Sequence, residues 1–246
     1  ELMLSSKNLL KPSAGEPITN ATQDMVMGCY YLTRELPGKA GEGKIFANRE
    51  EAILNYDLQR THLQAKIKVR MDIGKGREFV ETTIGRLIFH EQVAEKVGLP
   101  FKNYVFGKGE LKNLVSECFN TFGPEKTAEL SDHIKDVGFK FATISGLTVS
   151  ASDMLVPESK YKMVDEALAR VKKVNDFYWK GWITADERYR HNLKIWTQAK
   201  NDIMKGLIDN FEKHHENDIY YQIDSGARGN WGQVTQLCGM KGLVAN

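Results

Sequence analysis

An arginine flanked by glycines is the residue of this chain whose chemistry best suits a phosphate. Arg228 stands in the run Gly226-Ala227-Arg228-Gly229. A guanidinium presents a rigid fork of donors that matches phosphate oxygens, and each charge-assisted hydrogen bond contributes roughly 1.5–3 kcal/mol. The two glycines would let another backbone approach closely. Taken by residue types alone, the same run also suits the start of a helix or a turn, so both interpretations stay open.

A second group of candidates lies in a locally basic stretch. Residues 170–200 hold eight Lys/Arg against three Asp/Glu, although the whole chain has a formal net charge of only +2. Such a stretch favours an acidic partner. Arg190 and Lys194 share one helical face because they are four residues apart. The candidate contacts are Lys180, Trp182, Arg190, His191 and Lys194. Alternatively, the charges only keep an exposed helix pair in solution, and the tryptophan only covers the helix ends.

Several other motifs fall short of a functional site. The runs Gly41-Glu42-Gly43-Lys44 and Gly107-Lys108-Gly109 do not complete G-x-x-x-x-G-K-[ST], so plain turns are expected there. The pair His214-His215 has no ligand partner at metal spacing and is interpreted as a solvated helix end. The three cysteines form no C-x-x-C pair, so neither a zinc site nor a disulfide framework is indicated; they are Cys29, Cys118 and Cys238.

Composition indicates a globular chain without a strong charge bias. Its 246 residues are 41% apolar, enough to build a packed core, and the pI is near 8.3. That balance argues against a protein that coats nucleic acid along its whole surface. The cysteine spacing, which indicates no disulfide framework, fits a reducing cytoplasm. No apolar run approaches about 20 residues, and residues 1–20 lack the order of a signal peptide. Because the chain starts at Glu1 without Met, we expect it to be a piece of a longer protein.

The elements that would position these residues are mainly helical. A short helix is predicted over 49–60, and alternation from Leu63 predicts a half-buried strand with Gln64 on its polar side. After a turn at 74–76, a second β-rich run is predicted over 79–89. Apolar residues three and four apart then predict helices near 109–121 and 124–137.

The strongest pattern predicts a helical hairpin over about 158–214. Apolar side chains recur three and four apart on both sides of a break at Gly181; they are Tyr161, Val164, Leu168, Val171 and Tyr178, then Tyr189, Leu193, Trp196, Ile203 and Leu207. Thr184 to Glu187 forms a capping box that starts the second helix. So short a turn, 180–183, makes the helices antiparallel. At 1.5 Å per residue, each helix would be roughly 30 Å long, so the hairpin is expected to protrude as an arm.

Three segments in order resemble the largest (beta-prime) subunit of bacterial-type RNA polymerases. The first is Lys7–Ile18 with Gln23-Asp24, and the second is Gly138–Thr143 with Asp153–Pro157. The third begins with Asp224-Ser225-Gly226-Ala227-Arg228-Gly229 and continues through Gln233, Gln236-Leu237 and Gly239–Leu243. The resemblance extends over the whole chain and implies an α+β, mainly helical fold. It also implies two domains, a pore domain over 1–146 and a funnel domain over 147–246.

The resemblance further implies a place beside the polymerase active centre. The two domains would surround the secondary channel through which nucleoside triphosphates enter, while the loop that holds the catalytic Mg²⁺ would precede this segment and the bridge helix and trigger loop would follow it. Arg228 and Gln23 would line the nucleotide and RNA path, although such a glutamine also suits a local cap. Gln233, Gln236 and Lys241 would support the trigger loop from the F-loop, or be ordinary exposed polar residues.

The implied partners are those of a transcription enzyme. They are the beta, alpha and omega subunits, the rest of beta-prime, the DNA template, RNA, nucleoside triphosphates and, at the hairpin rim, transcript-cleavage factors and related regulators. This chain departs from the Asn, Lys and Asp common at the rim positions that Arg190, His191 and Lys194 match. By itself the chain is expected to be inactive.

Two other hypotheses belong to different classes. One is an interaction module whose basic hairpin binds an acidic protein outside any polymerase. The other is an RNA-binding protein that acts alone, which is disfavoured because no aromatic stacking platform lies next to a basic groove.

Overall fold

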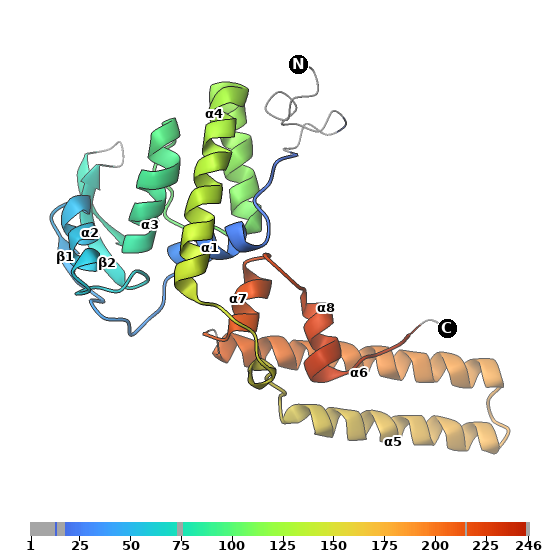
Figure 1. The fold of residues 1–246 in the computed structure, drawn as a ribbon. Coiled ribbons are helices and arrows are strands. Elements are labelled where there is room, and N and C mark those ends of the chain that lie inside the picture. The colour runs from blue at the N-terminus through green and yellow to red at the C-terminus, as the bar shows by residue number, and fades with distance from the viewer. Residues whose placement is uncertain (1–12, 14–17, 73–75, 215, 245–246) are drawn as a thin grey trace. The chain divides into compact units, whose positions relative to one another are not determined.

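The chain folds into two compact units, seen in a computed structural model that describes residues 13, 18–72, 76–214 and 216–244. The N-terminal unit comprises the described residues up to Leu147 together with Asp224–Arg228. The C-terminal unit comprises Thr148–Ile223 and the described residues from Gly229 onward. Helices dominate, and one small mixed sheet accompanies them, so the predicted α+β, mainly helical class is confirmed (Figure 1). No helix among the described residues is long and apolar enough to cross a membrane.

The sheet of the N-terminal unit has the order β1-β2-β3. Strand β1 (Ile45–Phe46) pairs in parallel with β2 (Lys66–Asp72), and β2 pairs antiparallel with β3 (Arg77–Thr83). Helix α2 (Arg49–Asp57) begins after Asn48, whose side chain accepts a hydrogen bond from the Glu51 amide. The helix predicted over 49–60 is therefore present, three residues shorter.

Two details of the predicted β region are wrong. The run expected to stay extended to Phe89 turns helical at Ile84, because the Thr83 hydroxyl accepts from the Arg86 amide and so caps α3 (Ile84–Phe89). All residues of α3 are buried, so periodicity alone cannot separate this segment from a buried strand. Gln64, expected on the polar side, is buried, and its Nε2 donates to the Tyr31 carbonyl at 2.7 Å.

Two short helical turns and then a long, broken helix follow α3. A π-helical turn (His90–Ala94) and a 3-10 turn (Glu95–Val97) end at Gly98, which has φ 84°. The long element α4 (Lys108–Ser145) contains a break at Gly123, with φ 81° and ψ −174°, followed by Pro124. Because Pro cannot continue the hydrogen-bond ladder, two helices result, as predicted. The second runs to Ser145 instead of 137, and 107–109 forms the start of α4 instead of a free turn.

Helix α1 (Asp24–Thr33) is the element that sequence patterning missed. It lies across α4 and α3, where glycines allow close approach of backbones (Figure 1). A Cβ built on Gly28 would lie 1.8 Å from the Gly138 carbonyl oxygen, and one built on Gly85 would lie 1.7 Å from the Leu32 carbonyl oxygen. Because α1 packs between neighbours, its apolar residues do not fall on a single stripe.

The C-terminal unit contains the predicted antiparallel hairpin. Helix α5 (Ser159–Trp179) and helix α6 (Ala185–Lys213) run side by side, joined by residues 180–184 (Figure 1). The Thr184–Glu187 capping box is present, with the Thr184 amide donating to the Glu187 carboxylate at 2.8 Å. His214 ends α6 as an exposed cap, while His215 lies outside the described residues. Whether the hairpin protrudes from the rest of the chain stays a prediction.

The apolar seam of the hairpin is narrower than predicted. Ile203 and Leu207 are buried, but Tyr161, Leu168 and Tyr189 are 67%, 49% and 68% exposed. The buried side chains belong to the base, where α6 packs against α8 (Trp231–Val234) and the π-helical turn Thr235–Gly239. Exposed apolar side chains occur both toward the tip, at Tyr189, and in the first turn of α5, at Tyr161.

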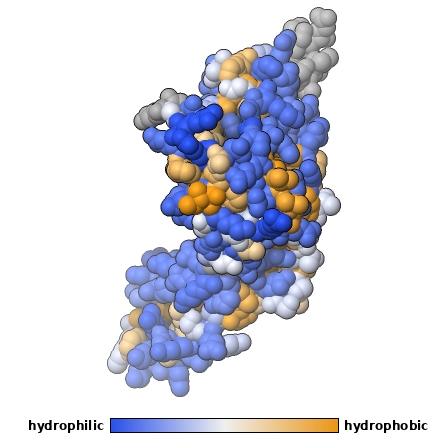
Figure 2. All heavy atoms as spheres, turned by 90° about the vertical axis from the view of Figure 1, so that its left-hand side faces the viewer, coloured by the Kyte–Doolittle hydropathy of each residue, from blue (hydrophilic) through white to orange (hydrophobic). Residues whose placement is uncertain are grey.

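The surface of the chain also keeps hydrophobic patches. Figure 2 shows them as orange areas among hydrophilic side chains on the face that it draws. In the N-terminal unit, Phe79 is 61% exposed on β3 and Phe139 is 48% exposed on α4. Exposed apolar groups that are gathered in patches are typical of surfaces that contact other chains.

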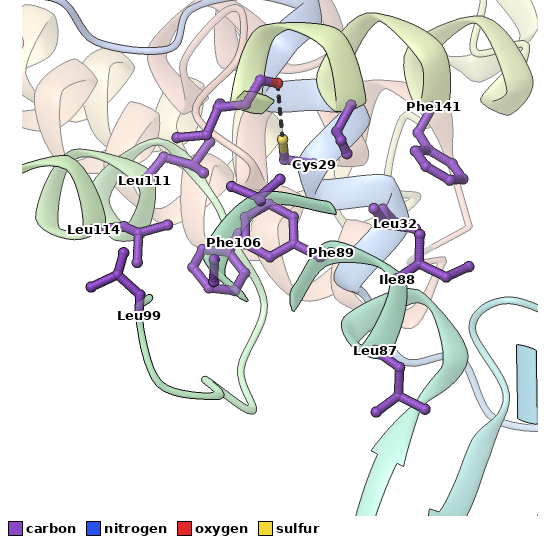
Figure 3. Close-up of a cluster of buried hydrophobic side chains, with 14 of the residues drawn as sticks. Cys29, Leu32, Leu87, Ile88, Phe89, Leu99, Phe106, Leu111, Leu114 and Phe141 are labelled. Atoms are coloured by element: carbon purple, nitrogen blue, oxygen red, sulfur yellow. Dashed lines mark hydrogen bonds between the residues drawn. The ribbon is translucent and has the colours of Figure 1, made fainter. Parts of the chain in front are cut away.

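The core of the N-terminal unit gathers side chains from α1, α3, α4 and the loop before α4. Phe89 and Phe106 stack with ring centroids 4.2 Å apart, and Leu32, Leu111 and Phe141 pack in the same cluster (Figure 3). The Cys29 thiol points toward the Ile134 carbonyl in this cluster. Complete burial raises the pKa of this thiol to about 12, so the group stays protonated at neutral pH and is no nucleophile.

Candidate functional site

The segment Asp224–Arg228 lies on the N-terminal unit, between helix α7 (Asp218–Asp224) and α8. The Lys108 amide donates to the carbonyl of Ser225 at 2.9 Å, and Ser225 is buried. The Tyr30 hydroxyl, on α1, donates to the Asp224 carboxylate. Ala227 packs against the hydrophobic core of this unit. The segment is therefore attached at three successive points.

Arg228 stands at the end of this attached segment. It is exposed, and its guanidinium has no hydrogen-bond or ion-pair partner among the described residues. Gly226 and Gly229, on either side, have φ of 70° and 80°, a conformation that glycine adopts without steric cost. The glycines thus form turns, as one interpretation held, and the turns leave the guanidinium open to an anion.

Gln23 directly precedes helix α1. It is exposed, has φ 48° and ψ −119°, and occupies the N-cap position without a side-chain capping bond. A positive φ is unfavourable for a residue with a Cβ and is found most often where the surroundings enforce it. The side chain therefore does not serve the local cap that sequence chemistry offered as an alternative.

The three candidates near the C-terminal end of the chain differ in their surroundings. Gln233 is engaged locally, because its Oε1 accepts from the Asn230 amide at 3.1 Å while the Asn230 side chain accepts from the Gln233 amide. This capping box starts α8. Gln236 and Lys241 are exposed beyond it. Only the last two offer side chains that are not already used to build the helix.

The tip of the hairpin combines aromatic and basic side chains. Trp182 is 68% exposed and lies against Phe177 at a centroid distance of 5.3 Å, and the Lys180 ammonium lies 5.1 Å above the Trp182 ring. Arg188 lies 4.2 Å above the Tyr178 ring. Trp182 therefore contacts the last turn of α5 while most of its surface stays exposed, so both interpretations of this residue remain predictions. The other predicted rim residues, Arg190, His191 and Lys194, are all exposed on α6.

Several side chains of these two surfaces carry no local signal in the sequence. Tyr30 sits in an apolar run, and its partner Asp224 is 194 residues away, so no local signal connects them. Phe177 and Trp179 at the tip belong to the helical pattern of α5 and were not separated from it. The aromatic residues at the end of a basic hairpin were the signal that could have been used.

Metal or pocket chemistry finds no support at these positions. Among the described residues no group of three His, Cys, Asp or Glu side chains converges. A cavity of about 650 Å³ lies beside β2, lined by Arg49, Arg70 and His90 among others, and contains none of the candidate residues. Burial lowers the pKa of His90, which keeps its ring neutral. We therefore assign the candidate site to the attached segment and α1, and a separate candidate surface to the hairpin tip.

Comparison with known proteins gives consistent matches. The family model described as RNA polymerase Rpb1, domain 3, matches residues 8–154, and the model described as RNA polymerase Rpb1, domain 4, matches residues 183–246. The DNA-directed RNA polymerase subunit beta' of Acetivibrio thermocellus is 41% identical over 260 residues, covering 100% of this chain and 22% of the relative. The beta' subunits of Desulforamulus reducens and Desulforudis audaxviator are 42% and 43% identical, again over 100% of the chain. The chain thus spans about a fifth of the length of these relatives.

Proposed function

The chain belongs to the RNA polymerase Rpb1 family, and on this premise we propose that it serves DNA-directed RNA synthesis as a segment of subunit beta'. The observation that carries the proposal is the identity of 41% to 43% to beta' subunits along the whole chain. Exposed hydrophobic patches on the surface support assembly with further polypeptide, which we propose to be the rest of beta' and the beta, alpha and omega subunits. A cytoplasmic location is part of the same proposal.

We further propose that the chain forms the wall of the secondary channel and not the catalytic centre. Residues 1–146 would form the pore domain and 147–246 the funnel domain. Nucleotidyl transfer by this enzyme class uses Mg²⁺ to stabilise the attacking and leaving oxygens. Since the described residues offer no converging metal ligands, the Mg²⁺ site would lie in another part of the subunit. The side chains here would bind and orient, and would transfer no group themselves.

Within this wall, Arg228 and Gln23 are the proposed contacts to nucleotide and RNA. The Arg228 guanidinium is exposed, offers several N–H donors, and has no competing carboxylate among the described residues. Those properties suit the triphosphate of an incoming nucleotide. Gln23 offers both a donor and an acceptor, which suits a base or ribose edge near the RNA 3′ end. Gln236 and Lys241 would contact the folded trigger loop, while Gln233 would fix the start of α8 through its capping bond.

The hairpin tip is the proposed docking surface for transcript-cleavage factors and related channel regulators. Replacing Trp182 with alanine is expected to weaken binding of such a factor to the assembled polymerase by about tenfold or more, because exposed tryptophans beside cations are frequent binding hot spots. The dissociation constant can be measured with a fluorescently labelled factor.

Tyr161 provides a matched control for this prediction. It lies on the same hairpin, is 67% exposed against 68% for Trp182, and also has a lysine ammonium over its ring. Tyr161→Ala should leave factor binding unchanged. Equal losses from both variants would show that the hairpin responds to any loss of aromatic surface, and would remove the tip as the docking surface.

A pull-down tests the proposed function as a whole. Tagged protein expressed from its own gene should recover the beta, alpha and omega subunits in a complex that extends RNA on a DNA template, whereas the chain alone should incorporate no nucleotide. Recovery of an acidic protein without these subunits would contradict the proposal and favour the interaction module.

A further inference from the structure

We propose that Tyr30 is a positioning residue for Arg228, acting through its hydrogen bond to Asp224. The inference rests on the proposed function of Arg228 as a contact to the triphosphate, and extends it to a residue that touches no substrate. The Tyr30 hydroxyl donates to the Asp224 carboxylate, four residues before Arg228 along the chain. Both belong to the N-terminal unit.

The segment that carries Arg228 needs external attachment. Between the end of α7 at Asp224 and the start of α8 at Trp231 the backbone forms turns, with positive φ at Gly226 and Gly229. A segment of this kind has no internal helix or sheet ladder to fix it, and glycine adds conformational freedom. Its geometry therefore depends on the groups that it contacts.

The contacts of the segment involve its first residues and end before Arg228. Asp224 is bound by the Tyr30 hydroxyl, the Ser225 carbonyl by the Lys108 amide, and the Ser225 hydroxyl accepts from the Ala227 amide at 3.2 Å. A Cβ built on Gly226 would lie 3.2 Å from the Lys108 Cβ, so the backbone is already close to α4 there. Arg228 follows directly, exposed and without a partner among the described residues. The hydrogen-bonded residues before Arg228 thus determine the position of its backbone, and so of its side chain.

Tyr30 is well placed to act as a fixed point. It is only 5% exposed, it lies on α1, which packs against α3 and α4, and the Arg34 guanidinium lies 5.6 Å from its ring centroid. The same helix begins beside Gln23, seven residues away, or about 10 Å along the axis. Helix α1 would therefore position Gln23 directly, at its start, and Arg228 indirectly, through the bond from Tyr30 to Asp224.

The test uses Tyr30→Phe and Asp224→Ala in the assembled polymerase. Phenylalanine keeps the buried ring and removes only the hydroxyl. Each variant is expected to raise the apparent KM for nucleoside triphosphates about fivefold while kcat changes less than twofold, because binding geometry is lost and the chemical groups remain. In an Arg228→Ala background the same changes should add nothing, since the residues act as one unit. Tyr56→Phe, a partly buried tyrosine of α2 in the same unit, is the control and should leave KM unchanged.

Hydrogen exchange of the amides of residues 225–229 gives a second, substrate-free readout. Exchange should be faster in Tyr30→Phe and Asp224→Ala than in the parent enzyme and unchanged in Tyr56→Phe. Unchanged exchange in the first two variants would overturn the proposed attachment. Faster exchange with an additive effect on KM would show a general structural role and overturn positioning. If Arg228→Ala itself leaves KM unchanged, the proposed function of Arg228 fails, and hydrogen exchange still decides the attachment separately.

Discussion

Replacing Arg228 with alanine in the assembled polymerase is expected to raise the apparent KM for nucleoside triphosphates by roughly ten- to a hundredfold. The guanidinium is exposed and without a partner among the described residues, so its removal leaves no buried charge behind and the fold should be unaffected. The equivalent of one charge-assisted hydrogen bond to phosphate would then be lost, worth roughly 1.5–3 kcal/mol. Initial rates of RNA extension over a range of nucleotide concentrations measure the effect.

Two further variants sharpen this experiment. Arg228→Lys should recover part of the affinity, because an ammonium keeps the charge but loses the two-pronged geometry. Arg60→Ala removes an exposed arginine from the same unit outside the candidate site, and should leave the kinetics unchanged. Nucleotide kinetics that are the same for Arg228→Ala and the parent enzyme would take Arg228 out of the nucleotide path.

The largest expected effect on stability belongs to Gly28→Ala. The new Cβ would lie 1.8 Å from the Gly138 carbonyl oxygen and 2.7 Å from the Ala142 amide nitrogen. Both are backbone atoms of α4, so relief requires α1 and α4 to move apart and to open the core between them. Overpacking of this kind costs about 3 kcal/mol. Urea unfolding of the purified chain, followed by circular dichroism, measures the loss.

Gly109→Ala is the matched control for Gly28→Ala. Gly109 lies in the first turn of α4, and a Cβ there would meet nothing within 4 Å. Because alanine favours a helix, this variant should be as stable as the parent chain or up to about 1 kcal/mol more stable. A Gly28→Ala loss below about 0.5 kcal/mol would show that the two helices tolerate separation, contrary to the close packing described above.

The part of the fold that sequence could predict is the part in which local rules and tertiary packing agree. The capping box at Thr184 and the break at Gly181 located the hairpin turn to within a residue. Gly123-Pro124 located the break in α4 for the same reason, since Pro lacks the amide that a helix needs there. In both places a few neighbouring residues determine the structure.

Elements covered on several sides were not predictable in this way. Helix α1 packs against α3 and α4, and helix α3 is buried at every residue, so neither shows a polar face that would reveal its period. Near the hairpin tip the opposite holds: the helical spacing is correct, but Tyr189 and Leu193 remain exposed. Spacing predicts which side chains share a face, and it does not say whether this chain supplies anything to cover that face.

The residues of the candidate site also differ in whether local sequence or distant contacts reveal them. Arg228 became a candidate through its chemistry, its glycine neighbours and the family resemblance, without knowledge of any distant residue, and its contact to nucleotide stays a prediction. Tyr30 could not, because its importance depends on a contact that spans 194 positions. Gln23 lies between these cases: its residue type suggested a function, and only the backbone, with φ 48°, shows that the side chain is not used as a cap.

The allocation of Asp224–Arg228 to the N-terminal unit also constrains chimeric polymerases. A graft that exchanges everything after Leu147 for the equivalent part of another species would bring its own version of these five residues, while Tyr30, Gly107 and Lys108 would stay with the recipient. The grafted residues 224–228 would then have to pack against contact residues from a different species. Designers of such hybrids should transfer helix α1 and the start of α4 together with the graft, or keep 224–228 from the recipient.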